Sequence, residues 1–242
     1  MCQGPQARWG PADALGDKLN TGVKSHSVGD MPLATETLGF APVLSDYRQT
    51  WELQKRYHDE VLAGHRDSTI LLLEHSPVYT AGKRTEDFER PTDGTDVIDV
   101  DRGGKITWHG PGQLVAYCIY KLYDPKEVRL FVSQLEDAMI ALLAEYDIDA
   151  TTIEGRAGVW LKGDDVRRDR KIGAIGIRIH EGVTMHGLAL NCSNDLGAYE
   201  SIIPCGITDA DTTTISAELG RTVTPADVAQ RLDEILHETI TA

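Results

Sequence analysis

Two adjacent segments, residues 171–179 and 183–190, constrain the fold of this chain more than any other part of its sequence. They read KIGAIGIRI and VTMHGLAL, and a short turn at Glu181-Gly182 separates them. Apolar and β-branched runs of this length, bounded by turn residues, are typical of strands, and so short a turn makes them an antiparallel hairpin. The fold must therefore contain a sheet with antiparallel pairing.

Helices accompany that sheet. One is predicted from Ser45, as the N-cap, to Gly64, as the C′ residue, and another from about Pro225, a favoured first helical residue after Thr224. A further helix is predicted from six apolar residues that recur at the spacing of one helix face: Leu135, Ala138, Met139, Leu142, Leu143 and Tyr146. Helices and hairpins together indicate an α/β or α+β fold with a mixed sheet.

Short apolar runs predict the remaining strands at residues 69–74, 97–100, 114–120 and 158–162, with a strand or turn at 201–203. Between two of these strands lies DRGGKITWHGPGQ, residues 101–113, in which five of thirteen residues are Gly or Pro. Its adjacent glycines allow backbone N–H groups to approach a ligand, and Arg102 and Lys105 add positive charge. A tight structural turn would carry the same glycines, so this pattern alone leaves both interpretations open.

The charge balance excludes several classes of protein. The chain has 24 Lys+Arg against 38 Asp+Glu, a formal net charge of −14. Binding of nucleic acid through a basic surface is therefore disfavoured. The longest uninterrupted apolar runs, at residues 114–120 and 138–144, have seven residues each, far short of the roughly 20 residues that cross a membrane.

The first 32 residues differ in composition from the rest. Residues 1–32 are rich in Gly, Pro, Ala, Asp and Ser without periodicity, and we expect them to form a disordered N-terminal extension. This extension is either a leader or the result of a start codon assigned too far upstream, since Met31 lies at its end. Residues 33–242 are expected to form a single catalytic domain. Four scattered cysteines and no secretory signal point to a reducing, cytoplasmic location, and no Cys-x-x-Cys pair indicates a metal site.

One cysteine has a distinctive setting. Cys205 lies between Pro204 and Gly206, a sharp turn that would present its thiol, whereas Cys192 and Cys118 are expected to be buried small hydrophobes. A nucleophilic thiol needs a group that favours the thiolate at neutral pH. Three histidines and one lysine are candidates: His75, His109, His186 and Lys171.

Two of these candidates have alternative interpretations. His186 alternates with Leu188 and Leu190, which predicts that it shares their apolar face and serves the core. Lys171 opens the glycine-spaced strand, where partial removal from water would lower the pKa of a lysine. An exposed position at the strand end would leave it without a chemical role.

Five motifs, read together, resemble the bacterial octanoyltransferase family, the lipoyl(octanoyl) transferases of protein lipoylation. The resemblance covers roughly residues 36–235, and the motifs follow one another in the order and at the spacing of that family. The motifs are HSPVYTAGKR at 75–84, DRGGKITWHGPGQL at 101–114, GVW with RKIGAIGIRI at 158–160 and 170–179, HGLALN at 186–191 and IIPCGI at 202–207.

The resemblance implies the fold of biotin and lipoate protein ligase catalytic domains, with a larger mixed sheet and a smaller sheet flanked by helices. It implies transfer of an octanoyl or lipoyl group from acyl carrier protein to a lysine of lipoyl domains, through a cysteine thioester. The acceptors would be the E2 subunits of 2-oxoacid dehydrogenases and the glycine cleavage H protein. No cofactor is expected, because the donor carries its own phosphopantetheine thioester.

The family's functional residues map onto this sequence position by position. Cys205 and Lys171 take the catalytic positions. The substrate-binding positions fall on three stretches: Arg102, Gly103, Gly104, Lys105, Ile106, Thr107, Trp108 and His109; Ala174, Ile175 and Gly176; and His186, Gly187, Leu188 and Ala189. The glycines of these stretches would form a thin backbone wall along which an eight-carbon chain can lie.

The sequence departs from the family in few places. Cys118 stands where the family usually has proline, residues 163–169 form an enlarged loop before Lys171, and the leader has no counterpart. Two rival functions remain, an ATP-dependent lipoate or biotin ligase and a non-catalytic binding protein. Cys205 in its Pro-Cys-Gly turn disfavours the ligase, which needs no nucleophilic thiol. The presence of both Cys205 and Lys171 disfavours the binding protein.

The expected protein partners are themselves acidic, so a chain of net charge −14 needs a local basic patch to dock them. We predict such a patch around the entrance to the Cys205 site. Its members would be Lys83, Arg84, Arg102 and Lys105, with Arg167, Arg168 and Arg170 near the enlarged loop.

Overall fold

A large mixed sheet organises the structure, which is a computed structural model that describes residues 32–124, 126–202 and 209–240. Its strand order is β1-β2-β6-β10-β9-β8-β7, and β11 pairs with β9. Strand β1 is parallel to β2, β11 is parallel to β9, and the other neighbours are antiparallel. The strands are β1 Leu33–Gly39, β2 Ser68–Leu73, β6 Gln113–Ile119, β7 Thr151–Ile153, β8 Arg156–Leu161, β9 Arg170–His180, β10 Val183–Asn191 and β11 Asp211–Thr212.

A smaller sheet is built from three short strands in the order β4-β3-β5. They are β3 Val78–Ala81, β4 Val97–Asp99 and β5 Thr107–His109. The predicted mixed sheet is therefore confirmed, as is the implied division into a larger and a smaller sheet. The helices are α1 Tyr47–Leu62, α2 Val128–Ala144, α3 Ile215–Leu219 and α4 Pro225–Ile240, with short 3₁₀ helices at Asp87–Glu89 and Gly197–Ser201.

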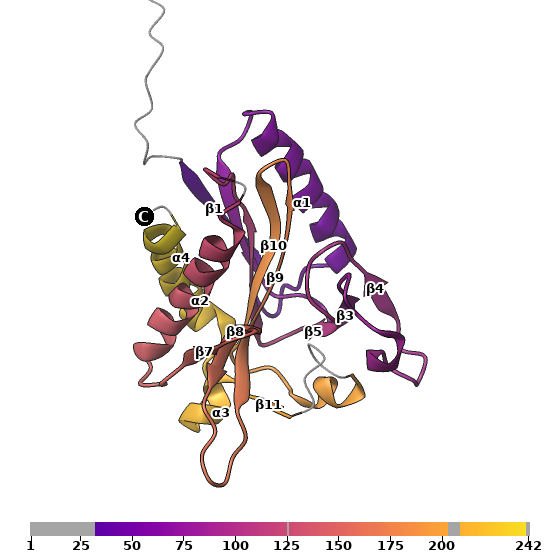
Figure 1. Cartoon of the computed structure of the whole chain (residues 1–242), viewed down its shortest axis with the longest axis vertical. Coiled ribbons are helices and arrows are strands. Elements are labelled where there is room, and N and C mark those ends of the chain that lie inside the picture. Colours follow the sequence, from indigo (N-terminus) through magenta and orange to yellow (C-terminus); the bar gives the residue numbers. More distant parts are fainter. Residues whose placement is uncertain (1–31, 125, 203–208, 241–242) are drawn as a thin grey trace, which may run out of the picture. The chain divides into compact units, whose positions relative to one another are not determined.

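Helices cover both faces of the large sheet (Figure 1). One apolar cluster joins the sheet to α2 and α4, and the predicted stripe of α2, from Leu135 to Leu143, is fully buried in it. A second cluster lies under α1 and includes Tyr47, Tyr117 and Val183. Residues Met31–Ala242 make one compact unit, and the predicted extension at 1–32 lies, apart from Pro32, outside the described residues.

The hairpin predicted from the sequence is the centre of the large sheet. Strands β9 and β10 pair over their full overlap, and their turn at Glu181 and Gly182 has positive φ at both residues, as a type I′ turn requires. Helix α1 ends as expected, with Gly64 in the left-handed region at φ 72°. None of the helices in the described part of the chain is long and apolar enough to cross a membrane.

Helix α1 begins one residue later than predicted. Asp46, not Ser45, is the N-cap, and its Oδ1 accepts a hydrogen bond of 2.9 Å from the Gln49 amide. Ser45 instead pairs with His75 as a β-bridge and donates its amide to Glu74 O. Of the strand or turn predicted at 201–203, Ser201 instead ends the 3₁₀ helix Gly197–Ser201, and Ile203 lies outside the described residues.

Candidate active site

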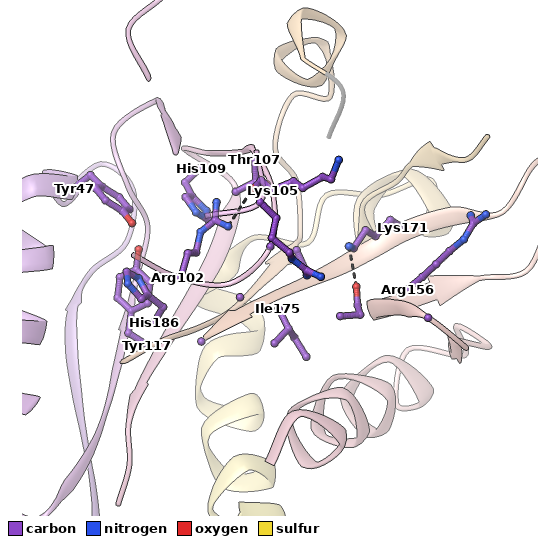
Figure 2. A pocket seen from close by; sticks show the side chains of 17 residues that line it. Tyr47, Arg102, Lys105, Thr107, His109, Tyr117, Arg156, Lys171, Ile175 and His186 are labelled. Carbon is purple, nitrogen blue, oxygen red and sulfur yellow. Dashed lines mark hydrogen bonds between the residues drawn. The ribbon is translucent and has the colours of Figure 1, made fainter. Parts of the chain in front are cut away.

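A cavity of about 280 Å³ lies between the central strands of the large sheet and the Gly-rich loop that leads into β5. Figure 2 shows Tyr47, Tyr117 and His186 at one end of it, and Lys171 and Arg156 at the other. The residues that line it are Tyr47, Arg84, Arg102, Gly104, Lys105, Thr107, His109, Tyr117, Gly155, Arg156, Ala157, Lys171, Ala174, Ile175, Gly176, His186 and Gly187.

Most residues predicted to bind substrate meet at this cavity, although they come from three separate stretches of sequence. The exceptions follow from strand geometry. Along 105–109 the odd-numbered residues line the cavity, while Ile106 and Trp108 point the other way and are buried. The Trp108 ring contacts the Tyr199 ring edge-on, with centroids 6.0 Å apart.

Three other predicted residues also lie away from the cavity. Leu188 belongs to the apolar cluster under α2 and α4, and Ala189 belongs to the cluster under α1. Gly103 uses its amide to donate a hydrogen bond of 2.9 Å to Ile177 O on β9. This bond fixes the Gly-rich loop against the large sheet.

Arg102 holds that loop together from inside. Its side chain is buried, and its guanidinium donates to the carbonyl oxygens of Gly103 and Lys105 and to the carbonyl and hydroxyl of Thr80, at 2.9–3.0 Å. The Arg102 side chain also explains one glycine, because a Cβ on Gly176 would lie 3.0 Å from Arg102 Cδ. Arg102 is thus a structural cation that borders the cavity.

Not every glycine at the cavity serves the substrate. A Cβ on Gly187 would overlap Ala116 O on the neighbouring strand β6, so this glycine is required for the pairing of β10 with β6. Gly104 has a φ of 84°, which favours glycine whether or not a ligand is present. The thin wall expected from the sequence therefore has structural causes as well.

The side chain of His186 points to the opposite face from the one predicted. Leu188 and Leu190 face α2 and α4, but the His186 ring lies against Trp51 and Tyr117, on the α1 side. The cause is the left-handed backbone of His186, with φ 60°, which interrupts the alternation of β10. The prediction of a shared apolar face was wrong because backbone strain at one residue is invisible in a pattern of period two.

Other groups replace the hydrogen bonds that this distortion removes. The His186 amide donates to Gln54 Oε1 of α1 at 2.9 Å. The Thr184 hydroxyl donates to Cys118 O at 2.6 Å and accepts from the Tyr120 amide at 3.0 Å, so it bridges the gap in the β6–β10 ladder. The strained residue is therefore built into the sheet.

His186 presents a hydrogen-bond acceptor. Its Nε2 lies 2.9 Å from Asp101 Oδ1, and Asp101 also binds Arg178. Although partial burial raises the pKa of Asp101, the bond from His186 and the Arg178 charge hold it at about 2, so Asp101 is an anion and Nε2 must be the donor. Burial lowers the pKa of His186 more than Asp101 raises it. The ring is neutral, and within the described residues its buried Nδ1 has no hydrogen-bond partner.

A chain of amides fixes the tautomer of His109. Asn191 Nδ2 donates to Thr213 O at 3.1 Å, so Asn191 Oδ1 accepts from Gln113 Nε2 at 2.9 Å. Gln113 Oε1 is then the atom 2.7 Å from His109 Nδ1, which must carry the proton. Burial, with His75 and Arg102 nearby, lowers the pKa of His109 to about 3. His109 is thus neutral and has its lone pair on Nε2.

The end of the cavity at Tyr47 and Tyr117 is also neutral. His75 Nδ1 lies 3.0 Å from Ser45 O and must donate to it, so His75 Nε2 accepts from the Tyr117 hydroxyl at 2.8 Å. Burial lowers the pKa of His75 to about 4 and raises that of Tyr47 to about 12. None of these groups can supply or accept a proton readily near pH 7.

Lys171 lies at the other end, on β9 between Trp160 of β8 and Thr212 of β11. Its Nζ donates a hydrogen bond of 2.9 Å to Ala157 O and lies 5.1 Å from the centre of the Trp160 ring. The side chain is half-buried and lines the cavity, so Lys171 is not the fully exposed strand-end residue of the alternative interpretation. The enlarged loop ends before β9 begins at Arg170.

The two described cysteines are unsuited to catalysis. Cys118 and Cys192 are fully buried, and burial raises the pKa of each thiol to about 12. Their predicted structural role fits this setting. The predicted nucleophile, Cys205, lies outside the described residues.

Some residues at the cavity were not predicted from the sequence. Tyr47 and Tyr117 looked like ordinary core residues on a helix and a strand, and Arg156 and Ala157 belong to a hairpin with no motif. Arg156 pairs with Asp209 at 2.5 Å on the rim. The only sequence feature that could have indicated Arg156 and Ala157 is their position just before the GVW motif at 158–160.

The predicted basic patch is smaller than the sequence implied. Arg102 is buried within its own loop, Arg170 pairs with Glu218 at 2.9 Å, and Lys105 pairs with the buried Glu89. Lys83 and Arg84 are exposed beside the cavity, and in the described residues neither has an ion-pair partner. The charge available for docking near the Gly-rich loop is therefore concentrated on these two.

Comparison with known proteins places this geometry in a family. Residues 46–237 match the model of the lipoyl protein ligase A/B catalytic domain. An octanoyltransferase of an Arthrobacter species is 59% identical over 204 residues, covering 84% of this chain and 92% of that protein. The octanoyltransferase of Mycolicibacterium smegmatis is 58% identical over 187 residues, covering 77% and 82%.

Solved structures agree on the fold. The bipartite lipoate protein ligase of Thermoplasma acidophilum, solved in a study of its lipoylation system, superposes with a TM-score of 0.60 at 13% identity, covering 86% of this chain and 82% of that one. A lipoate ligase structure from the same organism with bound lipoic acid gives 0.61 at 14% identity, covering 82% and 83%.

The fold, the cavity and these matches define an acyl-handling enzyme, and the chain belongs to the lipoyl protein ligase A/B catalytic-domain family. Within that family it falls with the octanoyltransferases, which are acyltransferases. Its activity is octanoyl transfer in protein lipoylation.

Proposed function

We propose that the octanoyl group comes from acyl carrier protein and passes through a thioester on Cys205 to a lysine of a lipoyl domain. The observation that carries this proposal is the position of Lys171, whose Nζ lines a cavity walled by Ala174, Ile175 and Gly176 of the same strand. An apolar wall next to an amine suits an acyl chain that ends in a reactive carbonyl. No cofactor is needed, because the donor is already a thioester.

The chemistry takes two steps. The Cys205 thiolate attacks the thioester carbonyl carbon, the bond to the phosphopantetheine sulfur breaks, and that sulfur leaves as a thiol with a proton from Lys171. The lipoyl-domain amine, in its neutral form, then attacks the acyl-enzyme. The amide forms, the Cys205 sulfur leaves, and Lys171 accepts the proton that the amine loses.

In this scheme the histidines at the cavity are neutral and do not carry the proton. His109 and His186 line the cavity, each has a lone pair on one ring nitrogen, and burial lowers the pKa of each. They can accept a hydrogen bond from the substrate, but they hold no proton to give near pH 7. Lys171 is therefore the proton carrier in our mechanism.

The acceptors in this proposal are lipoyl domains of 2-oxoacid dehydrogenase E2 subunits and the glycine cleavage H protein, and the reaction takes place in the cytoplasm. The T. acidophilum study pairs a ligase of the same fold with an E2 lipoyl domain, which supports this choice of acceptor. Lys83 and Arg84 are the charges that would dock acidic partners.

Intact mass spectrometry tests the covalent step. After incubation with octanoyl-acyl carrier protein, the protein should gain the mass of one octanoyl group, and the Cys205→Ser variant should gain none. A Cys192→Ala variant is the matched control, because its thiol is buried, and it should still be acylated. An unchanged mass for the wild type contradicts the proposal.

A ligase of the same fold is the second candidate, since one solved relative is a lipoate-protein ligase bound with ATP, with a TM-score of 0.59. Incubation with ATP, octanoate and a lipoyl domain separates the two. Acylation of the lipoyl domain under those conditions, without acylation from octanoyl-acyl carrier protein, favours the ligase. Retention of the wild-type transfer rate by Cys205→Ser or Lys171→Ala removes the proposed mechanism.

A further inference from the structure

One peptide group connects Lys171 to an acidic side chain on a different layer of the fold. The carbonyl of Ala157 accepts the hydrogen bond from Lys171 Nζ at 2.9 Å. The N–H of the same peptide, that of Gly158, donates to Glu136 Oε1 of α2 at 2.8 Å. Glu136 and Lys171 thus hold the two ends of a single peptide plane.

This peptide has little freedom to move. Gly158 has a φ of 109°, and a Cβ at this position would overlap Gly173 O and lie 2.9 Å from Lys171 Cε. The backbone of β8 is therefore packed directly on the Lys171 side chain. A small rotation of the peptide would move the carbonyl that Lys171 Nζ is bonded to.

The carboxylate strengthens the bond at the far end of the peptide. Hydrogen bonds to charged groups are shorter and stronger than neutral ones, and bonds in a chain polarise one another. An anion on the Gly158 N–H makes the Ala157 oxygen a better acceptor for an ammonium. Glu136 is half-buried, with Ala138 and Met139 beside it on α2 fully buried, so its backbone position is well fixed.

We propose that Glu136 is a positioning residue of the transfer reaction, which sets the place of Lys171 Nζ through the Ala157–Gly158 peptide. The inference rests on the proposed function, in which Lys171 moves protons at Cys205. Among the described residues, Glu136 is not one of those that line the cavity. Its effect should therefore fall on the rate of the chemical step and leave substrate binding unchanged.

Three substitutions separate the parts of this role. Glu136→Gln keeps an oxygen that can accept from Gly158 and removes the charge. Glu136→Asp keeps the charge but withdraws it by one methylene. Glu136→Ala removes both, and Asp137→Ala, at the neighbouring exposed position of α2, is the matched control.

We expect the kcat for transfer from octanoyl-acyl carrier protein to a lipoyl domain to fall about tenfold in Glu136→Ala, since misplacement of a reacting group by about 1 Å can cost up to about a hundredfold. Glu136→Asp should be similarly slow. Glu136→Gln keeps the bond to Gly158 but loses the charge that strengthens it, so its rate should fall between those of Glu136→Ala and the wild type. KM for both substrates should stay within about twofold, and Asp137→Ala should match the wild type.

Two results overturn the proposal. One is a Glu136→Ala or Glu136→Asp variant as fast as Asp137→Ala, and the other is a Glu136→Gln variant as slow as Glu136→Asp. Lys171→Ala, measured alongside, distinguishes this failure from that of the proposed function. If Lys171→Ala is inactive while the Glu136 variants are normal, only the positioning role fails, whereas an active Lys171→Ala removes the mechanism itself. Glu136→Gln, the mildest change, keeps the test informative if Glu136→Ala does not fold.

Discussion

Neutral imidazoles inside the site make the folded protein sensitive to mild acid. Burial lowers the pKa of His75 to about 4 and that of His109 to about 3, whereas a histidine in an unfolded chain has a pKa of about 6.5. Below about pH 6.5 the unfolded chain binds protons that the folded state rejects. The free energy of unfolding therefore falls as the pH falls, until the pH drops below the pKa values that the histidines have in the folded protein.

The expected loss is large enough to measure. At pH 5.0 each group is about 1.5 pH units below its unfolded pKa, and at about 1.36 kcal/mol per unit each histidine costs about 2 kcal/mol. The two together cost about 4 kcal/mol, a large part of the roughly 5–15 kcal/mol by which domains are stable. His186 adds to the loss in the same direction. Asp101, with a pKa of about 2, does not titrate in this window.

Urea unfolding at pH 7.5 and 5.0, followed by circular dichroism, measures this loss. His109→Gln and His75→Gln each remove one titrating group, so each variant should lose about 2 kcal/mol less than the wild type between the two pH values. That difference holds even if the variant is less stable at pH 7.5. His65→Gln, at an exposed position, is the control and should lose as much as the wild type. Equal losses in the wild type and in His109→Gln would refute the reasoning.

Three further changes have effects that follow from packing and charge. Gly187→Ala should lower the free energy of unfolding by about 2 kcal/mol or more, measured in urea, because its Cβ would overlap Ala116 O. Leu135→Ala, in the core under α2, should cost about 3 kcal/mol in the same assay. Charge reversal at Lys83 and Arg84 should lower kcat/KM for acyl carrier protein at low salt, with little change in kcat. The difference from the wild type should shrink in roughly 0.5 M salt, because salt at that concentration screens exposed charges strongly.

The sequence was sufficient to predict the elements with long regular patterns. The β9–β10 hairpin, the α2 stripe and the beginning of α4 at Pro225 were all confirmed. Strands β3 and β5 were missed because they have four and three residues and lie in turn-rich sequence. They are strands only because they pair with each other, and pairing is a property of the fold that no local pattern contains.

The site was predictable in its composition and less so in its roles. The motifs correctly selected residues that meet at one cavity, including Lys171 and His109. They could not show that the Arg102 guanidinium donates hydrogen bonds to carbonyl oxygens of its own loop. They also could not show that a side chain at Gly187 would overlap the neighbouring strand. Both facts depend on contacts between segments far apart in the chain. The direction of His186 depends on one backbone angle, which leaves no trace in the spacing of apolar residues.

That backbone angle also provides an internal reporter on helix docking. The amide hydrogen of His186 lies in the middle of a central strand, yet it is bonded to the Gln54 side chain of α1 at 2.9 Å. Its neighbours along β10 owe their protection from solvent exchange to strand pairing, whereas His186 owes its protection to the helix. Transient detachment of α1 would therefore expose a single amide of the sheet to deuterium while the strands around it remain paired.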